Sequence, residues 1–327
     1  MIYMVFAIIF VLMLVSELIY FATAKRLNIV DQSNPRSSHT SVTLRGGGIV
    51  FLFGVWLYAA FFGITYPLFL LGLTIIGLVS FIDDIRSLSV GCRLLVQFVS
   101  VFLMLCQLGL PDIHYWWLVP VVLVVCVGIV NAYNFMDGVN GITGGYSLAV
   151  LLPLIYLNHS YGFIDNAFLC VVGMSLIVFC IFNFRRKAVC FAGDVGSISI
   201  AFILLFALCR LILATGDMSY LVFLAVYGVD AVLTICHRMR LHENLGEAHR
   251  KHAYQLMANE LKVPQLLVTS LYMVLQLAIS AGLIFLPVNH YVYFAAVVVI
   301  LAIAYIIFMK KNYHLHREYL DSNNIKS

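Results

Sequence analysis

Residues 196–214 read GSISIAFILLFALCRLILA, an apolar run in which Arg210 is the one charged residue. The run is close to the length of about 20 residues that an α-helix needs to cross a bilayer. Similar runs recur along the whole chain. Because an α-helix satisfies its own backbone hydrogen bonds in lipid, these runs predict membrane-spanning helices.

The composition of the 327-residue chain supports this interpretation, since 63% of the residues are hydrophobic and only 10% are charged. Soluble domains carry about 25% charged residues, so this chain has too few to cover a surface that faces water. The eight cysteines lie singly, without a Cys-x-x-Cys pair. The sequence therefore indicates neither a disulfide framework nor a zinc site.

Hydropathy predicts an all-α polytopic transmembrane helix bundle that forms a single domain over residues 1–327. Lys25 and Arg26 follow the first apolar run instead of preceding it, so we expect a retained span rather than a cleaved signal peptide. About eleven spans are expected, at residues 1–22, 46–63, 66–82, 93–110, 116–133, 144–158, 163–182, 196–214, 218–236, 265–286 and 290–309.

With eleven spans, the lysines and arginines fall in loops on one side of the membrane, and only Arg210 falls elsewhere. The positive-inside rule makes that side cytoplasmic, with the N-terminus outside and the C-terminus inside. The loops on the other side are short, such as 63–66 and 111–115. We therefore expect function in the cytoplasmic loops or within the bundle.

Four polar clusters lie at the cytoplasmic ends of the predicted spans: Asp83-Asp84, the run from Asn131 to Gly141, the Gly-flanked Asp194, and the segment from Glu247 to His252. A further polar loop ends in Arg45-Gly46-Gly47-Gly48. Within the second cluster, Asn134 and Asp137 are three residues apart and would share one face of a helix.

Each cluster alone also has a simpler interpretation, because aspartates cap helices and glycines pack helices together. Their combination on one face favours chemistry. Mg²⁺ prefers one or two carboxylates together with substrate phosphates, and arginines bind phosphate groups well. The clusters therefore predict a site for a phosphorylated, water-soluble donor at the membrane surface.

The order of these motifs resembles that of the polyprenyl-phosphate N-acetylhexosamine-1-phosphate transferase superfamily, over most of the chain. The segment 247–252 is most similar to the branch that starts O-antigen or capsule chains. One departure is Asn140, where the family usually has a second aspartate.

The resemblance implies transfer of N-acetylhexosamine-1-phosphate from a UDP-amino sugar to undecaprenyl phosphate, with release of UMP, in the first membrane step of a cell-surface polysaccharide such as lipopolysaccharide. It implies a multi-pass protein of the bacterial inner membrane with a cytoplasmic active site. Mg²⁺ is the expected cofactor, with Mn²⁺ as an alternative. The expected partners are the donor, the lipid acceptor and the bilayer, without nucleic acid; a homodimer is compatible with the resemblance.

By the same resemblance, the catalytic residues are Asp83, Asp84, Asp137 and Asp194. Asp194 is the first choice as metal ligand, with Asp137 or Asp84 as the second ligand, and Asp83 or Asp84 is the base. The lipid phosphate is already largely dianionic at neutral pH, so a base contributes less than the usual factor of about 10²–10⁴. The expected substrate-binding residues are Arg36, His39, Arg45, Asn131, Asn134, His249, Arg250 and His252.

Two other classes of protein stay open at this point. A secondary transporter also combines many spans with a few buried acids, but it places them near the midplane on broken helices. A catalytically silent scaffold is favoured only by Asn140. Asp230 in the ninth span, and less so Glu17 in the first, are intramembrane acids and therefore candidates for function.

Overall fold

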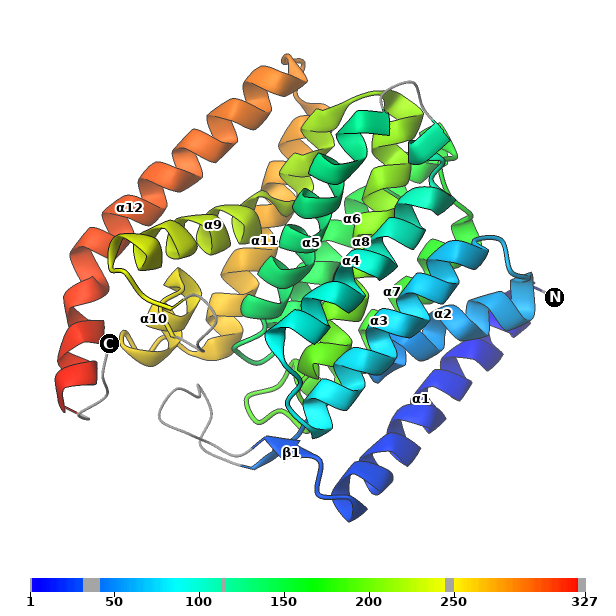
Figure 1. Ribbon diagram of the computed structural model, residues 1–327, viewed down its shortest axis with the longest axis horizontal. Helices are drawn as coiled ribbons and strands as arrows, with labels where there is room; N and C mark the ends of the chain where they lie inside the picture. The colour runs from blue at the N-terminus through cyan, green and yellow to red at the C-terminus, as the bar shows by residue number, and fades with distance from the viewer. Residues whose placement is uncertain (1, 32–41, 113–115, 245–249, 323–327) are drawn as a thin grey trace.

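The computed structural model describes residues 2–31, 42–112, 116–244 and 250–322, which form a bundle of α-helices (Figure 1). The helices are α1 (Ile2–Arg26), α2 (Ile49–Phe62), α3 (Pro67–Ile85), α4 (Val90–Gln107), α5 (Val119–Phe135), α6 (Ile142–Tyr161), α7 (Asn166–Asn183), α8 (Gly193–Thr215), α9 (Ala225–Arg240), α10 (Ala253–Asn259), α11 (Gln265–Phe285) and α12 (His290–Ser322). Short 3-10 helices span Leu110–Asp112, Trp116–Leu118 and Met218–Leu224.

Each of the eleven predicted spans coincides with a helix, and α10 is an additional short helix. Within the described residues, eight helical segments are long and apolar enough to cross a membrane, while α2 and α5 are shorter apolar helices. The all-α polytopic fold is thus confirmed. The count of eleven spans and the orientation stay predictions.

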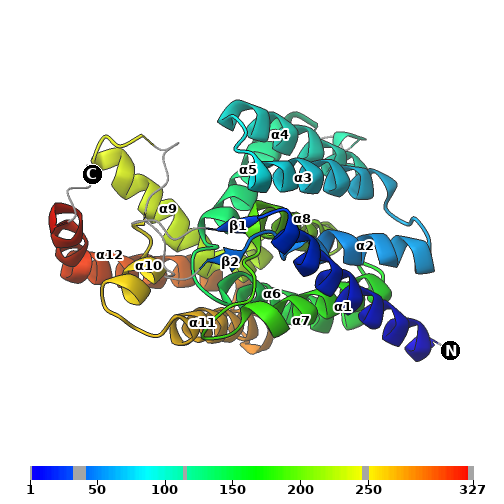
Figure 2. The same ribbon diagram turned by 90° about the horizontal axis from the view of Figure 1, so that it is seen from below.

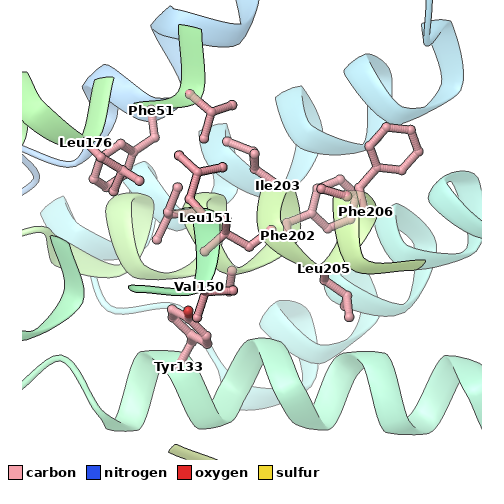
Figure 3. Close-up of a cluster of buried hydrophobic side chains, with 14 of the residues drawn as sticks. Phe51, Tyr133, Val150, Leu151, Leu176, Phe202, Ile203, Leu205 and Phe206 are labelled. Atoms are coloured by element: carbon pink, nitrogen blue, oxygen red, sulfur yellow. The ribbon is translucent and has the colours of Figure 1, made fainter. Parts of the chain in front are cut away.

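Helix α8 forms the centre of the bundle, because most of its side chains are buried. A helix that is apolar on every face is expected to be surrounded by other helices. Figure 3 shows side chains of α2, α5, α6 and α7 gathered around it. Phe69 of α3 stacks on Phe206 with ring centroids 4.2 Å apart. By contrast, α12 exposes large apolar side chains such as Ile303 and Ile307, as expected for a helix that faces lipid.

The chain runs up and down through the bundle, so the C-terminal ends of α3 and α5 meet the N-terminal ends of α4, α6 and α8 at one end. At this end, β1 (Val30–Asp31) pairs with β2 (Thr43–Leu44) in a short antiparallel ribbon. Figure 2 views the molecule from this side, with the ribbon near its middle. Leu44 also bridges to Cys190, which precedes α8.

Helix α9 departs from the direction of the bundle and reaches sideways to α12 (Figure 1). Asp230 on α9 is buried and accepts hydrogen bonds from the Tyr272 hydroxyl at 2.7 Å and from the backbone N–H of Ala253 at 3.1 Å. This intramembrane acid therefore holds the start of α10 against α9 and α11.

Candidate active site

Asp84 connects the end of α3 to the beginning of α8. Its side chain is fully buried and accepts hydrogen bonds from the backbone N–H groups of Asp194 at 2.8 Å and Val195 at 3.0 Å. Arg45 Nε donates to the same carboxylate at 2.7 Å. The first N–H groups of a helix have no partner within the helix, so Asp84 satisfies two of those of α8. Helix α3 continues to Ile85, three residues beyond the predicted span, and thereby carries both aspartates.

The glycines after Arg45 pack against the start of α8. The backbone N–H of Gly47 donates to the carbonyl of Phe191 at 2.9 Å, and that of Gly48 donates to Ala192 at 3.1 Å. A Cβ atom on Gly48 would overlap the Cα atom of Gly196. These glycines therefore hold two backbone segments together, and the Gly47 and Gly48 N–H groups already have carbonyl partners.

Asp194 lies where α3, α4, α5 and α8 meet. Its Oδ1 accepts a hydrogen bond from Asn134 Nδ2 at 2.9 Å, and the Asp83 carboxyl is within hydrogen-bond reach. The guanidinium groups of Arg45 and Arg93 lie 3.6 and 3.7 Å from its oxygens, so they attract the carboxylate without bonding it closely. Its side chain is 15% exposed, whereas that of Asp84 is not exposed at all.

Asp83 is the second carboxyl beside Asp194. It accepts hydrogen bonds from the backbone N–H of Leu88 at 2.5 Å and from Arg93 Nη1 at 3.1 Å. Asp83, Asp84 and Asp194 with Arg45 and Arg93 form what we call the carboxylate cluster. Its three acids and two guanidiniums leave a formal charge of −1, which suits a cation.

Among the described residues, no group of three His, Cys, Asp or Glu side chains is arranged to hold a metal ion. Mg²⁺ does not require such a group, because it commonly binds one or two protein carboxylates and completes its shell with water and substrate phosphates. The adjacent carboxyls of Asp83 and Asp194 fit that mode of binding. The residues present are therefore compatible with the expected Mg²⁺.

Asp137 lies beyond the end of α5, in the loop 136–141, and not on the helix with Asn134. Its carboxyl accepts a hydrogen bond from the Thr143 hydroxyl at 2.5 Å. Burial raises the pKa of Asp137 to about 6, the hydrogen bond from Thr143 opposes this shift, and the charge of Asp84 adds to it. The carboxyl that contacts Asp194 is that of Asp83, while the predicted metal pairing of Asp194 with Asp137 stays a prediction.

Two asparagines of the same motif are held by their own partners. Asn131 donates to Gln97 Oε1 at 2.6 Å and accepts from Gln97 Nε2 at 3.3 Å, which joins α5 to α4. Asn140 donates from Nδ2 to the carbonyls of Arg185 at 3.1 Å and Arg186 at 3.3 Å. An aspartate carboxylate could not donate these bonds, so the amide at position 140 fits its surroundings.

The segment 250–252 pairs each of its basic side chains with an acid. Arg250 bonds Glu260 at 2.9 Å, Lys251 pairs with Glu243, and His252 Nδ1 lies 3.2 Å from Asp230. The following α10 reaches the loop of Asp137, because the Tyr254 hydroxyl donates to the carbonyl of Phe135 at 3.0 Å. The structure thus brings this motif beside the second cluster. Three predicted substrate-binding residues, Arg36, His39 and His249, lie outside the described residues.

Arg93 was not predicted as a site residue, although it contacts both Asp83 and Asp194. One feature of the sequence could have indicated that Arg93 belongs to the site: a short loop joins the aspartate pair to the next apolar helix. Such a loop must fold the first turn of α4 back onto the end of α3.

Glu17, the other intramembrane acid that the sequence predicted, is buried on α1. Its Oε1 lies 4.0 Å from Cys190 Sγ, beside Gly47.

The sequence of this region is similar to known families. Residues 66–212 match the glycosyl transferase family 4, and the match covers α3 to α8 with Asp83, Asp84, Asn134 and Asp194. Arg45 and the segment 250–252 lie outside it.

Several curated proteins are similar to the chain. A probable undecaprenyl-phosphate N-acetylglucosaminyl 1-phosphate transferase of Bacillus subtilis is 26% identical over 76% of this chain and 76% of its own length. An undecaprenyl-phosphate alpha-N-acetylglucosaminyl 1-phosphate transferase of Thermotoga maritima is 27% identical over 73% and 76%. A phospho-N-acetylmuramoyl-pentapeptide-transferase of Caldicellulosiruptor bescii is 33% identical over 52% of this chain and 61% of its own length. The chain thus spans only about three fifths of the last of these proteins.

These matches confirm the resemblance that the motifs predicted. They cover the helices that carry the carboxylate cluster. The names of these relatives differ in the sugar that is transferred. The chain is therefore similar to the polyprenyl-phosphate sugar-1-phosphate transferases over much of its length.

Proposed function

We propose that this protein transfers N-acetylhexosamine-1-phosphate from a UDP-amino sugar to undecaprenyl phosphate, giving undecaprenyl-diphosphate-sugar and UMP. The observation that carries the proposal is the carboxylate cluster, where Asp83 and Asp194 lie together between Arg45 and Arg93. The relatives named above supply the reaction class. The product would start a cell-surface polysaccharide of the O-antigen type on the cytoplasmic face of a bacterial inner membrane.

In the proposed reaction, an oxygen of the lipid phosphate attacks the phosphorus that carries the sugar, and UMP leaves. Both reactants are anionic, so the protein must bring like charges together. Arg45 and Arg93 each already contact Asp194 and are partly exposed, so their remaining N–H groups are suited to phosphate oxygens. Asn134 fixes the Asp194 carboxylate in place through its amide.

Asp194 and Asp83 are the residues that would hold Mg²⁺, with Asp137 at the edge of the site. When bound, Mg²⁺ neutralises charge on the pyrophosphate and on the leaving UMP. The three bonds to Asp84 leave this carboxylate without a free side toward a substrate, so we assign it to positioning α8 rather than to proton transfer. The lipid phosphate is largely dianionic at neutral pH, so the reaction depends little on a base.

The proposal is tested by UMP release from a panel of UDP-amino sugars. The assay contains the purified protein in detergent and undecaprenyl phosphate, with either Mg²⁺ or EDTA. We expect UMP from one donor, dependent on both lipid and Mg²⁺, and reversal of the reaction by excess UMP because one pyrophosphate linkage replaces another.

Asp217→Asn is a matched control variant, because Asp217 pairs with His290 at the other end of the bundle. It should keep its activity, whereas Asp194→Asn should lose it. Absence of UMP from every donor, in protein shown to be folded, would rule the transferase out and return a transporter or a silent scaffold as the explanation.

A further inference from the structure

Helices α9 and α12 enclose a cavity of about 430 Å³ that is separate from the carboxylate cluster. Within the part of the chain that the structure describes, its lining comes from these two helices, and we call it the α9–α12 groove. The side chains of Arg240, Lys310 and Arg317 line it, together with His237 and His314. None of the described residues that line it is acidic.

Along both helices, the side chains that line the groove change from apolar to basic toward the C-terminal end of the helix. On α9 it passes from Leu233 to Arg240, and on α12 from Ile306 and Met309 to Arg317. Residues three or four apart share one face of a helix, so each helix presents one continuous strip to the groove. The groove therefore has an apolar end and a cationic end.

Among the described residues, no salt bridge joins an acidic side chain to Arg240, Lys310 or Arg317. Glu243 lies close to Tyr313, but it is already bonded to Arg238 at 3.1 Å and paired with Lys251. Arg317 lies over the Tyr313 ring at 5.4 Å, which orients its guanidinium without neutralising it. The cationic end is thus prepared for an anion.

We propose that the α9–α12 groove binds an anionic phospholipid of the surrounding bilayer, with the phosphate at Arg240, Lys310 and Arg317 and an acyl chain along Leu233 and Ile306. Basic pockets between transmembrane helices are suited to anionic lipid headgroups. The apolar end continues into the lipid-facing surface of α12, where Ile303 and Ile307 are 53% and 60% exposed. A soluble phosphate would leave this apolar end unused. The proposal does not depend on the transferase activity.

The experiment measures lipid binding to the full chain in detergent by native mass spectrometry. The probes are phosphatidylglycerol, which is anionic, and phosphatidylcholine, which is zwitterionic. The groove variant is Arg240→Gln/Lys310→Gln/Arg317→Gln. The matched control, Lys25→Gln/Lys187→Gln/Lys311→Gln, removes the same charge from exposed positions that do not line the groove.

We expect phosphatidylglycerol to bind about tenfold more tightly than phosphatidylcholine. Each basic residue contributes about fivefold, so the groove variant should weaken binding about a hundredfold while the control leaves it unchanged. If the groove variant melts at a lower temperature, Lys310→Gln/Arg317→Gln on the exposed part of α12 replaces it, with about a 25-fold loss expected.

Equal binding by the groove variant and the control would overturn the proposal, as would equal binding of the two lipids. Displacement of the lipid by inorganic phosphate would assign the groove to a soluble anion instead. Displacement by undecaprenyl phosphate at lower concentration than phosphatidylglycerol would assign it to the acceptor. Each of these outcomes rejects a bilayer phospholipid as the ligand.

Discussion

Asp84 and Asp194 are aspartates at the same end of the bundle, but their oxygens differ in how they are used. Asp84 accepts from two backbone N–H groups and from Arg45, and its side chain is fully buried. Asp194 has one close donor, Asn134, and stays partly exposed. The first arrangement stabilises the fold, and the second leaves a carboxylate open to a ligand.

Asp84→Asn should therefore lower the melting temperature, because one side of the amide donates instead of accepting. Leaving a buried donor or acceptor unsatisfied costs about 1–3 kcal/mol. Asp194→Asn should keep the melting temperature but lower the rate of UMP release about 10²–10³-fold. This is the loss seen when an enzyme loses one group that stabilises charge in the transition state. Thermal unfolding in detergent and the UMP assay separate the two effects. A stable Asp84→Asn beside an unstable Asp194→Asn would refute this division of roles.

Asn140 allows a second prediction, because it stands where the family usually has an aspartate. Asn140→Asp should lower stability by about 1–3 kcal/mol, since both donated bonds to residues 185 and 186 are lost and a charge faces two carbonyls. Activity per folded molecule should be retained. Asn140→Ala removes the donors without adding charge, so the difference between the variants in thermal unfolding measures the repulsion. Greater stability of Asn140→Asp would contradict the assignment.

Among the helices, the start of α2 and the start of α8 approach each other closely, and this contact shapes the site. A Cβ atom at position 48 would overlap backbone atoms of α8, which cannot rotate away as a side chain can. Gly128 in α5 has open space beside it.

Gly48→Ala should therefore lower the melting temperature and abolish UMP release, because the two backbones must separate. Gly128→Ala should leave both unchanged or raise stability by about 0.5–1 kcal/mol, the usual helix preference for Ala. Differential scanning fluorimetry of the purified variants makes the comparison. Equal melting temperatures for the two would show that the purified protein does not maintain the close approach.

The helices that hydropathy predicts are the part of this fold that the sequence specifies most directly. Lipid cannot satisfy backbone hydrogen bonds, so every apolar run of sufficient length must be helical. Helix α10 was not predicted, because its seven residues are held by Asp230 and His252 rather than by their own periodicity. The all-α prediction also missed the β1–β2 ribbon, whose pairing is set by its place against α8.

The sequence places the acidic residues of the candidate site at one end of the bundle, but it does not predict the contacts between them, and their roles stay predictions. Asp84 and Asp194 are 110 residues apart, and no spacing rule shows that one carboxylate would bond the backbone of the other. Arg93 contacts Asp194 and Gln97 contacts Asn131 only because of the way in which α4 packs. These contacts depend on how the helices pack, which hydropathy does not describe.

The orientation of the whole bundle gives a further prediction. Cys92 is exposed at the N-terminal end of α4, beside the carboxylate cluster, and should face the cytoplasm. A variant with Cys92 as its single cysteine should react with a membrane-impermeant maleimide in inside-out vesicles and not in spheroplasts. Val288→Cys, exposed between α11 and α12 at the other end, should give the opposite pattern in a cysteine-free background. Labelling of Cys92 in spheroplasts would reverse the predicted topology.

The bond between Asp84 and the start of α8 also has a consequence for biosynthesis. When α3 emerges from the ribosome, the segment that caps onto Asp84 has not yet been translated, since it lies 110 residues further on. Arg45 is already synthesised and can pair with this carboxylate in the meantime. Arrival of α8 then completes the carboxylate cluster. A chain that stalls or inserts incorrectly before α8 thus carries every earlier motif and yet has no assembled carboxylate cluster.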